Sequence, residues 1–300
     1  MTVRISYAEC SARERIALLF DAGSFHEWLP PAARVTSPHL AQLGVPSAFD
    51  DGVAVGRARL AGRPVFVAAQ EGEFMGGGVG EVHGAKLVGL FRRALLQRPD
   101  ERPDAVVLLA ESGGVRLHEA NAGLIAVSEV MRALLDVRAA GIPVVVLIGG
   151  RNGCFGGMGI VARCADQVVI SDIGRLAMSG PEVIEASHGV EEFDSRDRAL
   201  VWRTTGGKHR YLVGDADQIV DDDVQAFRDA ALRAIDGGRP LTLAALQAEQ
   251  ALLAQRLQDG IGSDDAVALW RQLGIAQAAQ VPDLKASQVR ALRPAPEAAA

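Results

Sequence analysis

The sequence predicts an α/β fold with a helical C-terminal portion. Three patterns support this class: continuous apolar runs typical of buried parallel strands, helical spacing of apolar residues between those runs, and glycine clusters directly after them. Of the 300 residues, 49% are hydrophobic and only 5% aromatic, so aliphatic side chains must build the core. A chain of this length can bury a large core, and we expect a single domain over residues 1–300.

The N-terminal part predicts a helix and then a surface connection. A short helix is expected within residues 11–29, with Ser11 as its cap, Glu14 completing a capping box and Gly23 at its end. Residues 30–52 are rich in Pro, Gly and Ser and are expected to run over the surface.

The rest of the chain predicts alternating strands and helices. Strands are expected over residues 53–60 and 64–70 as a hairpin, and then over 105–110, 144–148, 167–171 and 175–178. Helices are expected over residues 85–97 and 119–140, from Pro181, and over 195–204, 221–236, 241–259 and 264–273. Residues 294–300 have no core-forming pattern and are expected to be a disordered tail.

Composition excludes several classes of protein. No apolar run reaches the ~18 residues of a membrane helix, and residues 1–10 lack the apolar stretch of a secretory signal. The cysteines Cys10, Cys154 and Cys164 form neither a disulfide framework nor a zinc pattern, and the six histidines show no metal-ligand spacing. The net charge of −6 argues against a nucleic-acid partner. We therefore expect a cytoplasmic protein without a metal site.

Glycine is the unusual residue of this chain. It contributes 33 of 300 residues, and it concentrates in residues 72–89, 113–114 and 141–159. Gly113 and Gly114 follow one predicted buried strand, and the cluster from Gly149 follows the next. Because ligands of α/β sheets bind at the carboxyl ends of parallel strands, these loops are expected to lie side by side. Paired backbone amides in such loops form oxyanion holes.

Phosphate binding is the alternative use of glycine loops. Gly76-Gly-Gly-Val-Gly80 resembles a dinucleotide fingerprint, but it begins about six residues after its strand, and no acidic residue follows on a second strand. No GxxxxGK[ST] motif is present. The sequence therefore disfavours a nucleotide-binding fold.

Side chains beside the loops offer few acid–base groups. Ser112 lacks the nucleophile-elbow pattern, so shaping the turn explains it better. Glu81 and His83 border the first glycine cluster and can exchange protons, although a solvated loop position also explains each. Lys86 can meet a phosphate or lie on the surface, and Arg116 can brace its loop or pair with an anion.

Main-chain donors without acid–base side chains suit a thioester enolate. Negative charge develops on the carbonyl oxygen, where two fixed N–H groups stabilise it. Decarboxylation of a malonyl thioester forms this enolate without a base, because the departing CO₂ leaves its bonding electrons behind. Only the final protonation needs a donor, and water, Glu81 and His83 remain open for that role.

Four ordered motifs carry a resemblance to a known family. Residues 12–25, Phe74-Met-Gly-Gly-Gly-Val-Gly80 with Gly84-Ala-Lys86, Ser112-Gly-Gly-Val-Arg-Leu-His-Glu119 and Gly180-Pro-Glu-Val-Ile-Glu185 resemble the carboxyltransferase subunits of acyl-CoA carboxylases. Residues 151–159, Arg-Asn-Gly-Cys-Phe-Gly-Gly-Met-Gly, look most like the β subunits of biotin-independent malonate decarboxylases. The resemblance spans residues 12–220.

The resemblance implies a crotonase-like fold, in which ββα units form a superhelix, and a lyase that decarboxylates malonyl-S-acyl carrier protein. It implies a γ subunit of the same fold, an acyl carrier protein subunit and an acyl-carrier-protein transferase subunit as partners. A phosphoribosyl-dephospho-CoA group on the carrier would present the substrate. Carried onto this chain, the oxyanion donors fall at Gly113 or Gly114 and at Gly156 or Gly157. The carrier arm is expected to contact Gly76, Gly77, Gly78, Lys86, Arg116 and Cys154.

Departures from the family pattern leave two alternatives. The chain lacks the zinc ribbon of acetyl-CoA carboxylase β subunits, and Gly78 stands where the family has Ser. Both departures favour the decarboxylase. A malonyl-thioester:biotin-protein carboxyltransferase subunit shares the enolate step and is the first alternative, and a non-catalytic carrier-binding subunit is the second.

Overall fold

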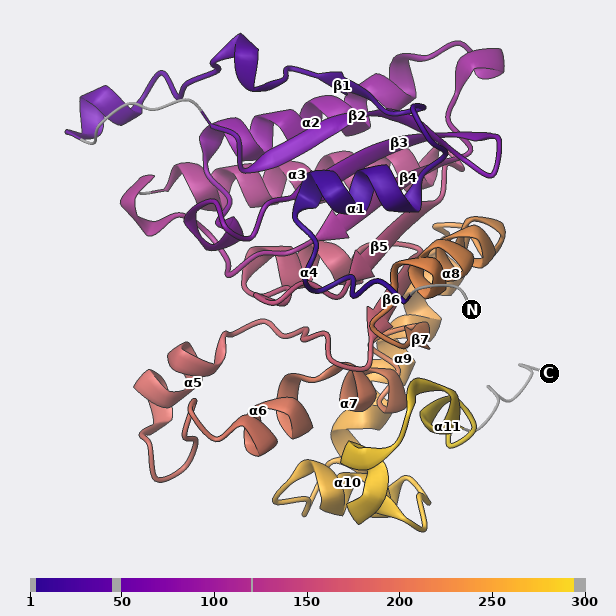
Figure 1. The fold of residues 1–300 in the computed structure, drawn as a ribbon. Coiled ribbons are helices and arrows are strands. Elements are labelled where there is room, and N and C mark those ends of the chain that lie inside the picture. Colours follow the sequence, from indigo (N-terminus) through magenta and orange to yellow (C-terminus); the bar gives the residue numbers. More distant parts are fainter. Residues whose placement is uncertain (1–3, 45–49, 120, 294–300) are drawn as a thin grey trace.

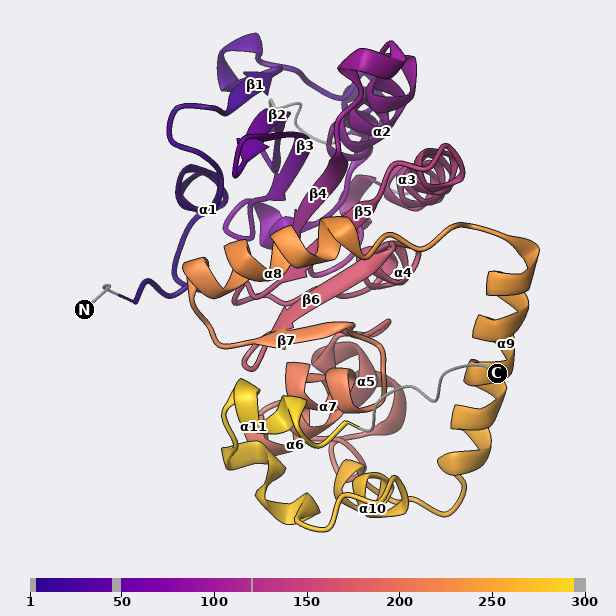
Figure 2. The ribbon, with the colours of Figure 1, turned by 90° about the vertical axis from the view of Figure 1, so that its right-hand side faces the viewer.

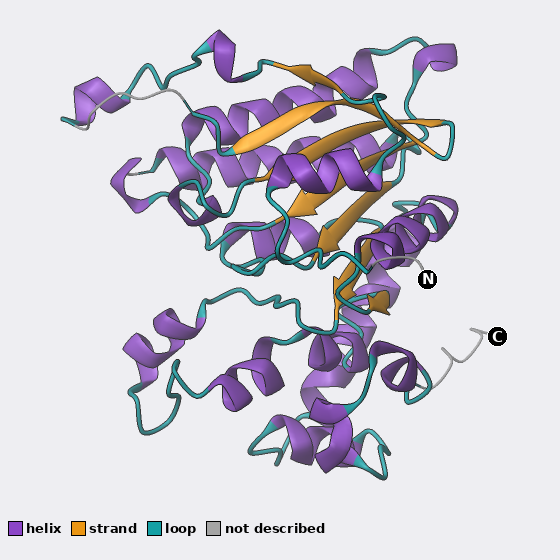
Figure 3. Cartoon of the chain, viewed as in Figure 1, coloured by secondary structure: helices purple, strands orange, loops and turns teal. Residues whose placement is uncertain are grey.

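A seven-stranded mixed sheet organises the molecule (Figures 1 and 3). The computed structural model describes residues 4–44, 50–119 and 121–293, so the predicted tail 294–300 lies outside the described residues. The strands neighbour one another in chain order: β1 (His26–Trp28), β2 (Val53–Leu60), β3 (Arg63–Gln70), β4 (Ala105–Ala110), β5 (Val144–Ile148), β6 (Gln167–Ser171) and β7 (Gln218–Val220). The first three strands pair antiparallel, and β3 to β7 are parallel.

Helices cover both faces of the sheet (Figure 2). One face carries α2 (Glu81–Leu96), α3 (Ala122–Ala139) and α4 (Gly157–Arg163), and the other carries α1 (Ala12–Leu19) and α8 (Val224–Asp236). The remaining helices lie toward the lower end of the sheet in the view of Figure 3. They are α5 (Pro181–His188), α6 (Arg198–Thr205), α7 (Gly207–Leu212), α9 (Leu243–Asp259), α10 (Ala266–Gln272) and α11 (Ala286–Arg290). Helix α9 stands to one side of the sheet in Figure 2.

Strand β4 shows why a continuous apolar run marks a buried strand. Val106, Leu108 and Ala110 pack toward α2 and α3, while the alternate residues Val107 and Leu109 pack toward α1 and α8. No residue of β4 is more than 2% exposed. Because both faces are covered, the usual alternation of polar and apolar residues is absent. The prediction of an α/β fold with a buried parallel core is confirmed.

Most element boundaries match the prediction, and the first helix is the main correction. The capping box of Ser11 and Glu14 is present, but α1 ends at Leu19, before Gly23. The chain then turns at Asp21, whose carboxylate accepts hydrogen bonds from the hairpin turn at Ala61 and Gly62. Residues 26–28 consequently add strand β1 to the sheet instead of continuing a helix.

Helix α2 begins at Glu81, four residues before the predicted start. Gly84 lies inside the helix, where a Cβ atom would collide with Cβ of Ala126 on α3. This glycine therefore permits close packing of two helices instead of forming a loop, and Glu81 and His83 are helical residues.

Short elements account for the other differences. The elements β1, β7, α4, α7 and α11 were not predicted from the sequence, and each is no longer than seven residues. Residues 175–178 form only isolated bridges, to Cys154 and Gly206, where a strand was predicted. The later helices begin two or three residues after their predicted starts. Among the described residues, no helix has the length and apolar character needed to cross a membrane.

Candidate active site

The glycine loops that follow β4 and β5 lie against each other, as predicted. Ser112 N–H donates to Gly153 O and Phe155 N–H donates to Ser112 O, both at 2.8 Å. A Cβ atom on Gly156 would lie only 2.9 Å from Cα of Gly114. The two loops touch at these glycines. At the point where the loops come closest, only backbone atoms are in contact.

The backbone amides of the loops differ in what they already bind. Gly113 N–H donates to Gly76 O and Gly156 N–H donates to Met178 O, each at 2.9 Å. Gly114 N–H reaches only the hydroxyl of Ser112, at 3.2 Å. Gly157 N–H has no acceptor among the described residues. Of the four glycines predicted as donors, Gly114 and Gly157 therefore have the more available amides.

Ser112 performs the structural role expected of it. Its side chain is fully buried, and its hydroxyl donates to Gly114 O at 3.2 Å. The hydroxyl thus closes the turn that carries Gly113 and Gly114.

The first glycine cluster supports the loop after β4. Besides the bond from Gly113 to Gly76, Gly77 adopts φ +67°, and a Cβ atom there would collide with the carbonyl of Glu111. A Cβ on Gly78 would lie 3.0 Å from Cγ of Arg116. These glycines allow main chain and side chains to pack closely within the protein, and their predicted contact with a carrier arm stays a prediction.

A buried ion pair lies beneath the two loops. Arg15 on α1 pairs with Glu111, the first residue after β4, and both side chains are at most 7% exposed. The Glu111 carboxylate also accepts from Asn152 N–H at 3.0 Å, and Gln70 accepts from Glu111 N–H at 3.0 Å. Glu111 therefore joins four elements: its carboxylate binds α1 and the loop after β5, and its backbone N–H ties the end of β4 to β3.

Glycines make the space for this carboxylate. A Cβ on Gly72 would lie 2.5 Å from it, and one on Gly150 would collide with it. Sequence analysis missed Arg15 and Glu111 as site residues. The available signal was a glutamate directly after a buried strand, followed by the predicted oxyanion glycines.

Arg116 braces the same loop through a second buried cluster. Its guanidinium binds both oxygens of Asp50, at 2.7 and 3.0 Å, and Glu119 at 3.2 Å. Burial alone would raise the pKa of Asp50, but the adjacent Arg116 lowers that pKa below its ordinary value. Of the two roles predicted for Arg116, the structure shows bracing; the side chain is only 5% exposed and its charge is paired.

Two other predicted arm-binding side chains are also buried. Lys86 lies inside α2 at 5% exposure, and burial lowers the pKa of its ammonium group despite the opposing effect of Asp51. The thiol of Cys154 is fully buried, and this burial raises its pKa to about 12. The thiol therefore belongs to the core of this chain, and the contact of Cys154 with a carrier arm stays a prediction.

His83 and Glu81 lie in helix α2 instead of a loop, and of the two only His83 is closed to solvent, because Glu81 stays partly exposed. His83 is fully buried, with its Nε2 3.0 Å from Nε2 of Gln70. Burial lowers the pKa of His83 to about 3, so the ring is neutral at physiological pH. Glu81 binds the hydroxyl of Ser37 and Nδ1 of His39. Among the described residues, no group of three or more His, Cys, Asp or Glu is arranged to hold a metal ion.

Removing the charge of Glu111 is expected to destabilise the protein. Glu111→Gln leaves the buried guanidinium of Arg15 without a counter-charge, and breaking such a pair costs about 3–5 kcal/mol. Urea unfolding measures the loss. Glu101→Gln is the matched control: its partner Arg98 is 71% exposed, so we expect a change below about 0.5 kcal/mol. Equal effects of the two substitutions would contradict the buried-pair interpretation.

Because His83 is buried and neutral, we expect the free energy of unfolding to decrease in acid. The pKa of His83 is about 3 in the folded protein and near 6.5 when unfolded. Between these pH values the unfolded chain therefore binds one more proton, and the free energy of unfolding falls as the pH falls. This single group contributes a slope of about 1.4 kcal/mol per pH unit. Urea unfolding at several pH values should show that slope reduced in His83→Gln and unchanged in the exposed-site control His118→Gln; parallel curves for wild type and His83→Gln would refute the assignment.

Comparisons with known proteins show the family to which this sequence is similar. Residues 8–236 match the model of the carboxyl transferase domain. The chain is 46% identical to the malonyl-S-ACP:biotin-protein carboxyltransferase MADC of Malonomonas rubra over 234 residues, which are 75% of this chain and 73% of that protein. It is 30% identical over 191 residues to the acetyl-coenzyme A carboxylase carboxyl transferase subunit beta of Fusobacterium nucleatum, covering 60% of this chain and 59% of that one.

Solved structures extend the likeness to the fold. A chain of the Pseudomonas malonate decarboxylase hetero-tetramer in complex with malonate is 42% identical, with a TM-score of 0.81 over 90% of this chain and 98% of that chain. The transcarboxylase 12S core shares the fold with a TM-score of 0.60 at 24% identity, over 74% of this chain and 40% of that one. The predicted crotonase-like fold is confirmed by these neighbours. The chain belongs to the carboxyl transferase domain family, within the carboxyltransferase/crotonase superfamily.

Proposed function

We propose that this chain is the β subunit of a malonate decarboxylase, which converts malonyl-S-acyl carrier protein into acetyl-S-acyl carrier protein and CO₂. The observation that carries the proposal is the direct contact of two glycine loops, at Gly114 and Gly156, beside the available amide of Gly157. The match to a chain of the Pseudomonas malonate decarboxylase, which covers 98% of that chain, supports the choice of reaction.

The loops suit the enolate step. When the bond to the carboxylate breaks, CO₂ departs and the bonding electrons move toward the thioester carbonyl oxygen. The amides of Gly157 and Gly114 donate hydrogen bonds to that oxygen. The Gly114 amide first gives up its hydrogen bond to the Ser112 hydroxyl. The α-carbon of the enolate then takes a proton. We assign that proton to water, because His83 is buried and neutral and Glu81 is engaged by Ser37 and His39.

The substrate would arrive on a partner. We propose an acyl carrier protein subunit with a phosphoribosyl-dephospho-CoA arm, an acyl-carrier-protein transferase subunit that loads it, and a γ subunit of the same fold beside this chain. The hetero-tetrameric and hetero-dimeric assemblies of the Pseudomonas enzyme support a heteromeric complex. Three free cysteines are compatible with the reducing cytoplasm that we propose as its location.

A biotin-linked carboxyltransferase is the second candidate. The 46% identity to the Malonomonas rubra protein favours it, since that relative is a malonyl-S-ACP:biotin-protein carboxyltransferase. Both reactions share the enolate and differ in whether CO₂ is released or transferred to biotin.

The reconstituted complex distinguishes these reactions. We expect release of CO₂ from malonyl-S-acyl carrier protein that neither needs a biotin carrier nor responds to avidin. A requirement for the biotin carrier, or inhibition by avidin, would establish the carboxyltransferase instead. No turnover with either acceptor would favour a non-catalytic subunit.

The role of the Gly157 amide can be tested by removing its N–H. Proline is tolerated at the first position of a helix, which Gly157 occupies in α4. Because a Cβ there would lie 2.6 Å from the side chain of Val127, both variants are made with Val127→Ala to provide space. We expect Gly157→Pro to lower kcat about 10²–10³-fold relative to Gly157→Ala, as for loss of one oxyanion donor. Equal kcat values, with both variants folded, would exclude this amide from the reaction.

A further inference from the structure

A short chain of buried hydrogen bonds joins helix α2 to the start of the glycine loop after β4. Gln70, the last residue of β3, is 2% exposed, and its Oε1 accepts from Glu111 N–H at 3.0 Å. Its Nε2 lies 3.0 Å from Nε2 of His83 on α2. Because side chains alternate along a strand, Gln70 shares the α2 side of the sheet with Phe66 and Ala68. One side-chain amide therefore contacts both the helix and the loop.

These contacts fix which nitrogen of His83 carries the proton. A backbone N–H can only donate, so the Gln70 oxygen must face Glu111 and the Gln70 NH₂ group must face the ring. An NH₂ group also can only donate, so Nε2 of His83 is the acceptor. Burial lowers the pKa of His83 to about 3, and a neutral imidazole carries one proton. That proton is therefore on Nδ1.

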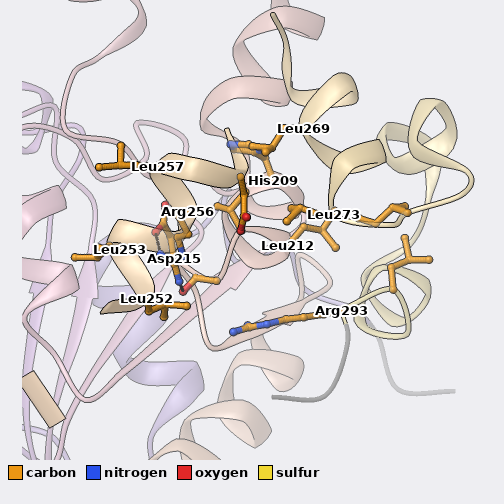
Figure 4. Close-up of a pocket in the computed structure, with 15 residues that line it drawn as sticks. His209, Leu212, Asp215, Leu252, Leu253, Arg256, Leu257, Leu269, Leu273 and Arg293 are labelled. Atoms are coloured by element: carbon orange, nitrogen blue, oxygen red, sulfur yellow. Dashed lines mark hydrogen bonds and ion pairs between the residues drawn. The ribbon is translucent and has the colours of Figure 1, made fainter. Parts of the chain in front are cut away.

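This tautomer leaves a buried donor unused. Nδ1 of His83 has no hydrogen-bond partner among the described residues. Cavities of about 740, 430 and 400 Å³ are formed by residues from Ile184 onward, and none of the three is lined by Gln70 or His83 (the first is drawn in Figure 4). A buried donor without an acceptor costs free energy that an apolar side chain would avoid. The bond that holds this tautomer is therefore the one between Gln70 and Nε2.

The other tautomer would release the loop. With the proton on Nε2, the ring would donate, and the Gln70 amide would have to turn its oxygen toward His83. Its NH₂ group would then face Glu111 N–H, so that two donors would meet. Glu111 would lose its acceptor at the start of the loop that carries Gly114. The tautomer of His83 and the position of this loop are therefore coupled.

The far end of the same loop is also tied to His83. Asp50 Oδ2 accepts from His83 N–H at 3.0 Å and from the Arg116 guanidinium at 2.7 Å. The loop is thus attached to the side chain of His83 at Glu111 and to its backbone, through Asp50, at Arg116. Gly114 lies between these two attachments, and its amide is one of the two that we propose to hold the enolate oxygen.

We infer that His83 and Gln70 are positioning residues, which hold the glycine loop after β4 in place through the Nδ1–H tautomer of His83. The inference rests on the proposed function, in which Gly114 donates to the enolate oxygen. Both side chains are buried, so they act through the loop and not on the substrate. Because they direct a donor that is needed in the transition state, they affect kcat more than substrate binding.

NMR of the ¹⁵N-labelled imidazole tests the tautomer in the full wild-type chain. We expect Nδ1 of His83 to be the protonated nitrogen and Nε2 to be unprotonated. This measurement needs no variant and does not depend on which reaction the complex catalyses. A proton on Nε2 would overturn the inference.

Two substitutions separate the acceptor at Nε2 from the rest of the side chain. The side-chain oxygen of Gln can take the place of Nε2, whereas that of Asn reaches only the position of Nδ1. In the reconstituted complex we expect His83→Asn to lower kcat about 10- to 100-fold with little change in KM, because a small displacement of a catalytic donor is costly. His83→Gln should retain kcat near the wild-type value. Equal kcat values for the two folded variants would overturn the inference.

Hydrogen exchange separates this inference from the proposed function. We expect the Glu111 amide to exchange faster in His83→Asn than in wild type or His83→Gln, because it loses its acceptor. If exchange at Glu111 is the same in all three proteins, His83 does not hold the loop and the proposed function still stands. If the wild-type complex releases no CO₂ from malonyl-S-acyl carrier protein, the proposed function is refuted, and exchange and NMR still decide whether His83 holds the loop.

Discussion

The site depends on one buried carboxylate, that of Glu111. It lies where β4 ends and the first of the two glycine loops begins, and it binds both Arg15 on α1 and the amide of Asn152 in the neighbouring loop. A buried charge is costly unless it is paired and hydrogen-bonded. The two loops that meet at Gly114 and Gly156 are therefore attached to a group that cannot easily move away from its partners.

The glycines around Glu111 act mainly through the space they leave. Gly72 and Gly150 make room for its carboxylate, Gly77 for its carbonyl, and Gly84 for the contact between α2 and α3. Gly114 and Gly156 permit the approach of the two loops themselves. The glycine excess thus serves two related purposes: it allows buried charges to fit beneath the site, and it leaves the backbone of the site unobstructed.

The buried charges also explain why acid–base side chains are scarce at the loops. Asp50 and Glu119 are both paired with Arg116, and His83 is held neutral by burial. These residues position the backbone and are closed to solvent. The proposed reaction begins by loss of CO₂ and needs no strong base, so it is compatible with a site that has few acid–base side chains.

The α/β class, the buried strands β4 to β6 and the two loops that meet could be predicted from the sequence, because long apolar runs and glycines after strands are local signals. The capping box at Ser11 could be predicted as well. Short elements such as β1 and α4 escaped prediction, since a few residues carry little periodicity. The pairing of Arg15 with Glu111 and the burial of Cys154 and Lys86 became visible in the folded chain alone. The folded chain also shows which loop amides are already engaged. Those properties depend on contacts between residues distant in the chain, and the physical cost of burying a charge, thiol or amide is set by what the fold places around it.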